Sequence, residues 1–295
     1  MDIKSTVVGH EKQREFLARS AASGRLAHAY IFSGPDGVGK KAVALELAAM
    51  LLCEKRNGCG ECGQCRTAAA GSNPDLIVLD GSDSIKIEQV RELVYKLSLK
   101  SYAGGNKIAI IDQAELMTTE ASNALLKAME EPTSGTHLFL ITSNAYRLLP
   151  TISSRAQRIS FGLVADEAIE PLLGGADQGK RSAILSLSAG RPGIAVRYTA
   201  ETDFDQAIGR LETFYGVFSG SDPVAKLQSA YELAEQETSD IRAALEYVLN
   251  KLEKELQEHA KTETARKMSG LSASLRYLSS NVNPKLLLFN LMLNS

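Results

Sequence analysis

Short apolar runs alternate with amphipathic stretches between residues 28 and 161, and this alternation predicts the elements of the first half of the chain. The apolar runs predict five strands: Ala29–Ser33, Asp75–Asp80, Lys107–Asp112, His137–Thr142 and Arg158–Phe161. The stretches between them predict four helices: Lys40–Leu52, Ile85–Leu99, Ala114–Glu130 and Leu148–Arg155. Strands that alternate with helices in this way are typical of a mostly parallel, doubly wound α/β domain, which we expect over residues 1–162.

The strand pattern stops after Gly162, and the rest of the chain predicts helices only. Residues 163–202 predict a small helical lid domain, broken by the glycines of Gly190-Arg191-Pro192-Gly193. Residues 203–295 predict a helical bundle, in which apolar positions between Ile241 and Leu256 keep one face over about four turns. The sequence leaves open whether this bundle is a globular cap or assembles with similar bundles of other subunits.

Composition and charge exclude several classes of protein. The 295 residues carry 33 basic and 35 acidic side chains, a net charge of −2, and 44% are hydrophobic, which excludes a disordered chain and a cationic nucleic-acid wrapper. The longest apolar runs, such as Leu286–Phe289, are far shorter than the roughly 20 residues of a membrane-spanning helix. The first residues lack the apolar segment of a signal peptide. We therefore expect a cytoplasmic protein without a membrane partner, and any contact with nucleic acid is expected to be shared with partner proteins.

A phosphate-binding loop is predicted between the first strand and the first helix. Residues Gly34-Pro35-Asp36-Gly37-Val38-Gly39-Lys40-Lys41 match the G-x-x-x-x-G-K part of the motif. Glycines at 34, 37 and 39 allow backbone N–H groups to point inward, the helix N-terminus adds positive potential, and Lys40 would reach the β- and γ-phosphates. A mere turn before a helix is the competing interpretation, which the strand context disfavours.

Two residues, one in the phosphate loop and one after a neighbouring strand, argue against ATP hydrolysis. Lys41 stands where a Ser or Thr hydroxyl ligates Mg²⁺, and an ammonium group cannot be a metal ligand. Asp112 ends the strand predicted over Lys107–Asp112, where its carboxylate would face the metal. Gln113 follows it in place of the glutamate that activates water in hydrolysing enzymes of this class. The sequence therefore favours a domain without intrinsic ATPase activity, and it leaves open whether the loop holds ATP or ADP without hydrolysing it.

All four cysteines lie within one short segment, Cys53-x5-Cys59-x2-Cys62-x2-Cys65. Thiolates at this spacing can close on one tetrahedral Zn²⁺, and four of them leave no position for water, so the site would be structural. Disulfides are disfavoured in reducing cytosol, and an iron–sulfur cluster is the chemical alternative. We interpret residues 53–65 as a zinc knuckle inserted into the α/β domain.

Together these features resemble the clamp-loader family of AAA+ proteins. The motifs that carry the resemblance are Val8-Gly9-His10, residues 25–30 (RLAHAY), the loop 34–41, the knuckle 53–65, residues 85–91, Asp112-Gln113-Ala114-Glu115, residues 123–127, Glu130-Glu131-Pro132 and Ser154-Arg155-Ala156. They cover about residues 5–200, and beyond that the likeness is one of general helical plan.

The resemblance implies a subunit of the loader that places the sliding clamp of DNA polymerase III on primer–template DNA. Its partners would be the gamma/tau-type ATPase subunits, a delta subunit, the clamp and, through the assembled complex, the DNA. The helical bundle would be a collar that holds the subunits together.

Arg155 is the catalytic candidate that the resemblance implies. It matches the arginine of a Ser-Arg-Cys motif that reaches the γ-phosphate bound by a neighbouring subunit, although Ala156 replaces the cysteine here. An ordinary surface ion pair is the alternative role for this side chain. Two further positions differ from ATPase members: Gly193 aligns with a nucleotide-sensing arginine, and Thr142-Ser143-Asn144 either contacts a phosphate or caps the next turn.

Three functions remain in competition on sequence grounds. The first is a non-hydrolysing loader subunit that supplies Arg155 in trans. The second is an ATP-hydrolysing gamma/tau-type motor, which Lys41 and Gln113 disfavour. The third is a zinc-dependent nucleic-acid-binding protein, which the balanced charge disfavours.

Overall fold

A computed structural model describes residues 7–81, 84–175, 177–200, 204–236, 238–258, 262–278 and 282–294. The chain divides into two compact units, one running to Leu172 and including Gly190–Gly193, the other formed by Leu173–Ala189 and Ile194–Ser295. The boundary expected between residues 202 and 203 falls within residues 201–203, which lie outside the described residues. The division into a lid domain and a bundle therefore stays a prediction.

The first unit is built on a five-stranded parallel sheet. Its strands are β1 (Ala29–Ser33), β2 (Leu76–Asp80), β3 (Lys107–Asp112), β4 (Thr136–Thr142) and β5 (Gln157–Ser160). They lie in the order β2-β3-β4-β1-β5, and every adjacent pair is parallel. The predicted parallel α/β domain is confirmed, and each predicted strand is present with bounds within one residue.

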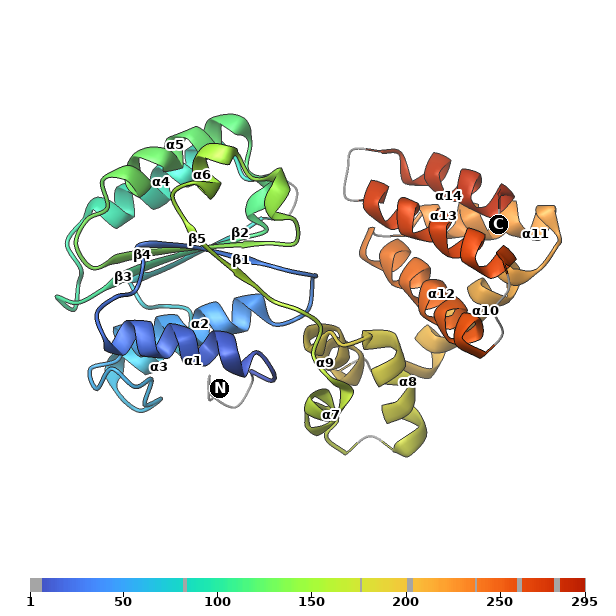
Figure 1. Cartoon of the computed structure of the whole chain (residues 1–295), viewed down its shortest axis with the longest axis horizontal. Helices are drawn as coiled ribbons and strands as arrows, with labels where there is room; N and C mark the ends of the chain where they lie inside the picture. The colour runs from blue at the N-terminus through green and yellow to red at the C-terminus, as the bar shows by residue number, and fades with distance from the viewer. Residues whose placement is uncertain are drawn as a thin grey trace. The chain divides into compact units, whose positions relative to one another are not determined.

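Helices cover both faces of this sheet (Figure 1). One face carries α1 (Glu11–Ala22), α2 (Lys40–Leu52) and α3 (Gly63–Ala69), and the other carries α4 (Ile87–Ser98), α5 (Thr119–Glu130) and α6 (Pro150–Ser153). Alternate side chains of a strand point to opposite faces, so β1 contributes Tyr30 and Phe32 to the core beneath α2 and Ala29 and Ile31 to the core beneath α4 and α5. All five residues of β1 are buried, as expected for a strand covered on both faces.

The helix predicted over Ala114–Glu130 is wrong as a single element. The chain forms a short 3-10 turn, η2 (Ala114–Leu116), and the α-helix starts only at Thr119. Ile85 N–H donates to Leu116 O at 2.9 Å, and Thr118 N–H donates to Ile85 O at 3.0 Å. These bridge bonds hold the chain extended at Met117, and the Thr118 hydroxyl then caps the helix by accepting from Ala121 N–H.

The other predicted helices of this unit differ mainly in their ends. The helix predicted over Ile85–Leu99 begins at Ile87, because Ile85 takes part in that bridge. The helix predicted over Leu148–Arg155 shrinks to α6, preceded by the 3-10 turn η3 (Ala145–Arg147). The helix predicted over Lys40–Leu52 is confirmed with the same bounds.

Every described element after β5 is helical. The elements are α7 (Asp166–Ile169), η4 (Glu170–Leu173), α8 (Gln178–Ser188), α9 (Pro192–Ala200), α10 (Phe204–Ser219), α11 (Pro223–Ala234), α12 (Thr238–Glu258), α13 (Thr262–Leu278) and α14 (Pro284–Leu293). Helices α10 to α14 share one apolar core in the second unit. Asp222 and Asn283 cap α11 and α14, and proline occupies the first helical position of each, where its missing N–H costs no hydrogen bond. A membrane-spanning helix does not occur among the described residues.

His137 on β4 gives a prediction about acid stability. Its Nδ1 lies 3.1 Å from Ala27 O, and burial, together with the charge of His28, lowers its pKa below 6.5 although the bond to Ala27 opposes this. Between that lowered pKa and 6.5 the unfolded chain binds more protons, so stability rises with pH there and is lost as the pH falls. We expect His137→Asn, which keeps an N–H donor but cannot titrate, to flatten the dependence of the free energy of urea unfolding on pH from about 7.5 to about 5. Equal slopes for the variant and the wild type would contradict this assignment.

Candidate functional site

The phosphate loop leaves β1 through a gap that admits only glycine. Because β1 lies between β4 and β5, the chain must pass the ends of both strands. Gly34 N–H donates to Thr142 O, the last residue of β4, at 3.2 Å. A Cβ atom on Gly34 would lie 2.1 Å from Phe161 O, just beyond β5. The first glycine of the motif is therefore required by packing as well as by its φ of 156°.

Two further contacts fix the loop from outside, and a left-handed glycine ends it. His10 Nε2 lies 2.8 Å from Val38 O, and since a carbonyl only accepts, this nitrogen carries the hydrogen. Gly193 N–H donates to Gly37 O at 2.8 Å, and a Cβ on Gly193 would approach that oxygen to 3.0 Å. Gly39 has a φ of 106° and precedes the first turn of α2. The backbone of Gly193 thus packs directly on the loop.

Lys40 turns back onto the loop itself. Its side chain is only 5% exposed, and Nζ donates to Gly34 O at 2.6 Å and to Pro35 O at 2.7 Å. Burial lowers the pKa of Lys40, while the charges of Asp36, Glu115 and Asp112 act to raise it. A phosphate group at this loop would compete with two backbone carbonyls for the Lys40 ammonium group.

Lys41 lies on the other side of the helix start, between two aspartates. Asp80 and Asp112 end β2 and β3 and occupy paired positions in the sheet, so their carboxylates lie side by side. Lys41 Nζ donates to Asp80 Oδ1 and lies 3.3 Å from Asp112 Oδ2. Burial acts to lower the pKa of Lys41, but the hydrogen bond to Asp80 and the charge of Asp112 outweigh it and the pKa rises. The ammonium group thus neutralises the acidic residue that the motif reserves for Mg²⁺.

Asp80 and Glu115 lie at this site although neither was predicted as a site residue, whereas Ser143 belongs to the predicted segment Thr142-Ser143-Asn144. Asp80 follows from the strand register alone, since it is the neighbour of Asp112. Glu115 Oε1 accepts hydrogen bonds from the backbone N–H and the hydroxyl of Ser143, while Oε2 is buried without a hydrogen-bond partner among the described residues. Asn144 caps η3 by accepting from Tyr146 N–H at 3.0 Å, which supports the capping role for this residue.

Arg155 lies apart from this group. Arg155 lies between α6 and the start of β5. The first residue of β5, Gln157, pairs with Tyr30 near the start of β1. The phosphate loop, in contrast, follows the end of β1. Arg155 is therefore at the opposite edge of the sheet from its own loop. Its side chain is 36% exposed and forms a 2.7 Å ion pair with Glu130, while Nη1 donates to Thr151 O.

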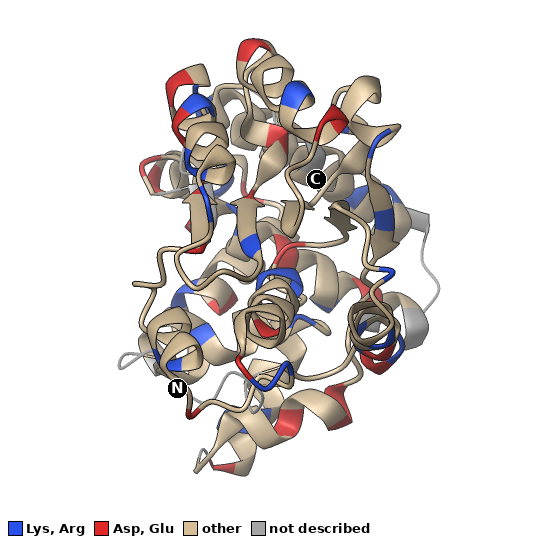
Figure 2. Ribbon diagram, turned by 90° about the vertical axis from the view of Figure 1, so that its left-hand side faces the viewer, with Lys and Arg blue, Asp and Glu red and all other residues tan. Residues whose placement is uncertain are grey.

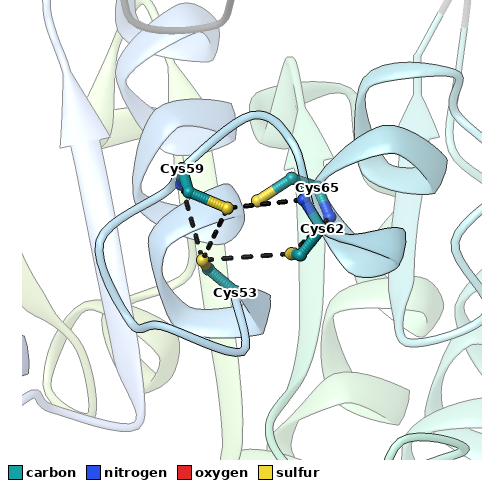
Figure 3. Close-up of side chains that lie close together, drawn as sticks. All are labelled: Cys53, Cys59, Cys62 and Cys65. Carbon is teal, nitrogen blue, oxygen red and sulfur yellow. Dashed lines mark hydrogen bonds between the residues drawn. The ribbon is translucent and has the colours of Figure 1, made fainter.

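The four cysteines converge on one point (Figure 3). Cys53 directly follows α2, Cys62 caps the start of α3, Cys65 lies in α3, and Cys59 comes from the loop between the two helices. Their sulfurs all lie within 4.8 Å of one another, with 3.6 Å from Cys53 to Cys59 and 4.0 Å from Cys53 to Cys62. Four thiolates around a tetrahedral ion with bonds of about 2.3 Å would lie about 3.8 Å apart. The predicted cluster is confirmed as a group that could hold a metal ion.

Backbone N–H groups aim at these sulfurs. The N–H groups of Cys59, Cys62 and Cys65 donate at 3.4 Å to the sulfurs of Cys53, Cys59 and Cys62 respectively. Burial opposes ionisation of Cys53, but the N–H groups around it lower its pKa to about 5. Burial raises the pKa of Cys65 to about 12. The fold thus supplies hydrogen-bond donors that stabilise thiolates before a metal ion contributes its own charge.

The fold and the loop define a P-loop α/β protein with an AAA+ fold. Residues 9–164, more than half of the chain, match the profile of the family described as "DNA polymerase III, delta subunit". The chain belongs to this family, which confirms the resemblance to clamp loaders.

Two curated relatives agree with this assignment, and one solved structure agrees with the fold. The chain is 45% identical over 135 residues to DNA polymerase III subunit delta' of Pseudomonas aeruginosa, covering 44% of this chain and 41% of that protein. It is 38% identical over 152 residues to subunit tau of Escherichia coli, covering 50% of this chain and 24% of that protein. A DNA polymerase III gamma subunit-related protein of Thermotoga maritima superimposes with a TM-score of 0.54 at 21% identity, over 95% of this chain and 97% of that one. The matched segment thus spans less than half of either curated relative.

Substitution of Gly34 tests the packing constraint on the loop. We expect Gly34→Ala to lower the free energy of unfolding by about 3 kcal/mol or more, because the new methyl group meets a backbone carbonyl in addition to the strained φ. Gly39→Ala is the matched control, since it also has a positive φ but meets nothing within 4 Å, and it should cost about 1–2 kcal/mol. Urea unfolding followed by circular dichroism measures both. Equal losses would show that the φ value alone decides.

Proposed function

We propose that this chain is a delta-prime-type subunit of a DNA polymerase III clamp loader, which does not hydrolyse ATP and supplies Arg155 in trans to a neighbouring ATPase subunit. Its partners would be the gamma/tau-type and delta subunits, the sliding clamp and, through the assembled complex, primer–template DNA. Family membership and the delta' name of a relative at 45% identity support this role.

The position of Arg155 is the observation that carries the proposal. A guanidinium group at the edge of the sheet opposite its own phosphate loop is suited to the nucleotide of another subunit. The pair with Glu130 is partly exposed on both sides, and such pairs contribute about 0–1 kcal/mol. Arg155 therefore loses little free energy when it leaves Glu130. A triphosphate carries more negative charge than a carboxylate and accepts a bidentate contact from the guanidinium group.

Lys41 and Gln113 favour this role over an ATP-hydrolysing gamma/tau-type subunit. Lys41 spans Asp80 and Asp112, which takes both carboxylates out of use as metal ligands. Gln113 is exposed, adopts a left-handed conformation and offers a neutral amide where a general base is needed. Any ATP or ADP held at Lys40 would then remain intact.

We assign the helical residues after β5 to the same clamp-loader role. Residues 163–202 would form the lid domain and residues 203–295 the collar that joins the other subunits. Charge supports shared rather than autonomous DNA binding, since basic and acidic positions are interspersed along the ribbon in the view of Figure 2 and the whole chain carries −2.

We infer that the four cysteines hold structural Zn²⁺. Cys53, Cys59, Cys62 and Cys65 fill a tetrahedral set with no position left for water, and the small N–H···S network suits thiolate ligands. The ion would stiffen the segment between α2 and α3.

Loss of Arg155 tests the proposed function. In a loader reconstituted with clamp and primed DNA, Arg155→Ala should reduce hydrolysis at the neighbouring site by at least about tenfold, because transition-state charge loses its partner. Glu130→Gln is the matched control: it breaks the ion pair but keeps the guanidinium, so steady-state ATP turnover should persist. Unchanged turnover in Arg155→Ala, or an equal fall in Glu130→Gln, would refute the trans role.

Replacement of two cysteines tests the zinc site. Cys59→Ser/Cys62→Ser should abolish a zinc content of about one ion per chain and lower the melting temperature of the protein. Asn57→Ala, inside the same loop but keeping its backbone N–H, should retain the ion. Metal analysis by atomic emission decides, and wild-type protein that carries iron or no metal would contradict the assignment.

A further inference from the structure

We infer that Lys41 is a built-in cation that takes the place of Mg²⁺, so that this site excludes divalent metal by holding its own positive charge. The inference deepens the non-hydrolysing role proposed above, because it names what has replaced the metal and what would restore it. It rests on three side chains, Lys41, Asp80 and Asp112.

The two carboxylates would repel each other without a cation. Asp80 and Asp112 occupy paired positions at the ends of adjacent strands, where like charges side by side are unfavourable. The Lys41 ammonium group contacts both, donating to Asp80 Oδ1 and lying 3.3 Å from Asp112 Oδ2. It therefore performs the charge balance that a metal ion performs in a P-loop site.

The same geometry is incompatible with Mg²⁺ in the native chain. Mg²⁺ requires oxygen ligands at about 2.0–2.1 Å in octahedral geometry, and an ammonium group offers only hydrogens. A metal ion between the aspartates would also lie beside the positive charge of Lys41. Mg²⁺ thus does not fit the residues present, although Asp112 is where the motif places its acidic ligand.

Both carboxylates, Asp80 and Asp112, are in place, so one substitution at Lys41 should restore a metal site. Lys41→Thr places a hydroxyl group on the first turn of α2, at the motif position that ligates the metal, and leaves both carboxylates unpaired. Lys41→Met removes the positive charge without adding a metal ligand. It therefore separates the effect of losing the charge from the effect of gaining the hydroxyl ligand.

Manganese binding to the isolated, zinc-loaded full chain tests the inference. Mn²⁺ prefers oxygen ligands, so the cysteine cluster does not interfere, and the free ion is counted by electron paramagnetic resonance. We expect Lys41→Thr to bind one Mn²⁺ at least about tenfold more tightly than the wild type, with Lys41→Met between them. Adding Asp112→Asn to Lys41→Thr should return the affinity to the wild-type level.

Two results would overturn the inference. One is wild-type protein that binds Mn²⁺ as tightly as Lys41→Thr, which would mean that the ammonium group does not exclude metal. The other is folded Lys41→Thr protein, verified by circular dichroism, that binds no Mn²⁺, which would mean that the carboxylates form no metal site. Neither result depends on the loader, so failure here is distinguishable from failure of the Arg155 proposal.

Discussion

The parallel alignment of all five strands is the constraint on which the rest of the first unit depends. Parallel strands bring their carboxyl ends to one edge, so the phosphate loop, Asp80, Asp112 and Ser143 meet there although they are far apart in the sequence. The segments that enter the strands meet at the other edge, which is why Glu130 and Arg155 lie close together. The parallel sheet alone thus places the phosphate loop at one edge and the partly exposed Arg155 at the other.

Much of this arrangement could be predicted from the sequence. Buried parallel strands are continuous apolar runs, and the runs that contain Ile31 and Ile110 are bounded by clear turn signals. The cysteine cluster was predictable because ligand spacing in a short segment leaves few geometries. The loop was predictable because its glycines and lysine have a fixed place between strand and helix.

What could not be predicted depends on contacts between distant segments. The break before Thr119 arises from hydrogen bonds with Ile85, which local periodicity does not report. The role of Asp80 requires the strand order, because only the pairing of β2 with β3 places it beside Asp112. The packing of Gly193 on Gly37 requires the chain to return to the loop after more than a hundred residues. In each case the sequence carries the residue but not its partner.

The two consecutive lysines at the start of α2 have their positive charges balanced by groups of this chain itself. Positive side chains at a helix N-terminus oppose the helix dipole, so each needs negative compensation nearby. Adjacent helical residues point about 100° apart, which sends Lys40 to the loop carbonyls and Lys41 to the strand ends. In a nucleotide-hydrolysing site, phosphates and a metal supply that balance together. Here backbone carbonyls and two aspartates supply it from within the chain, so the fold keeps the shape of the site without requiring its metal.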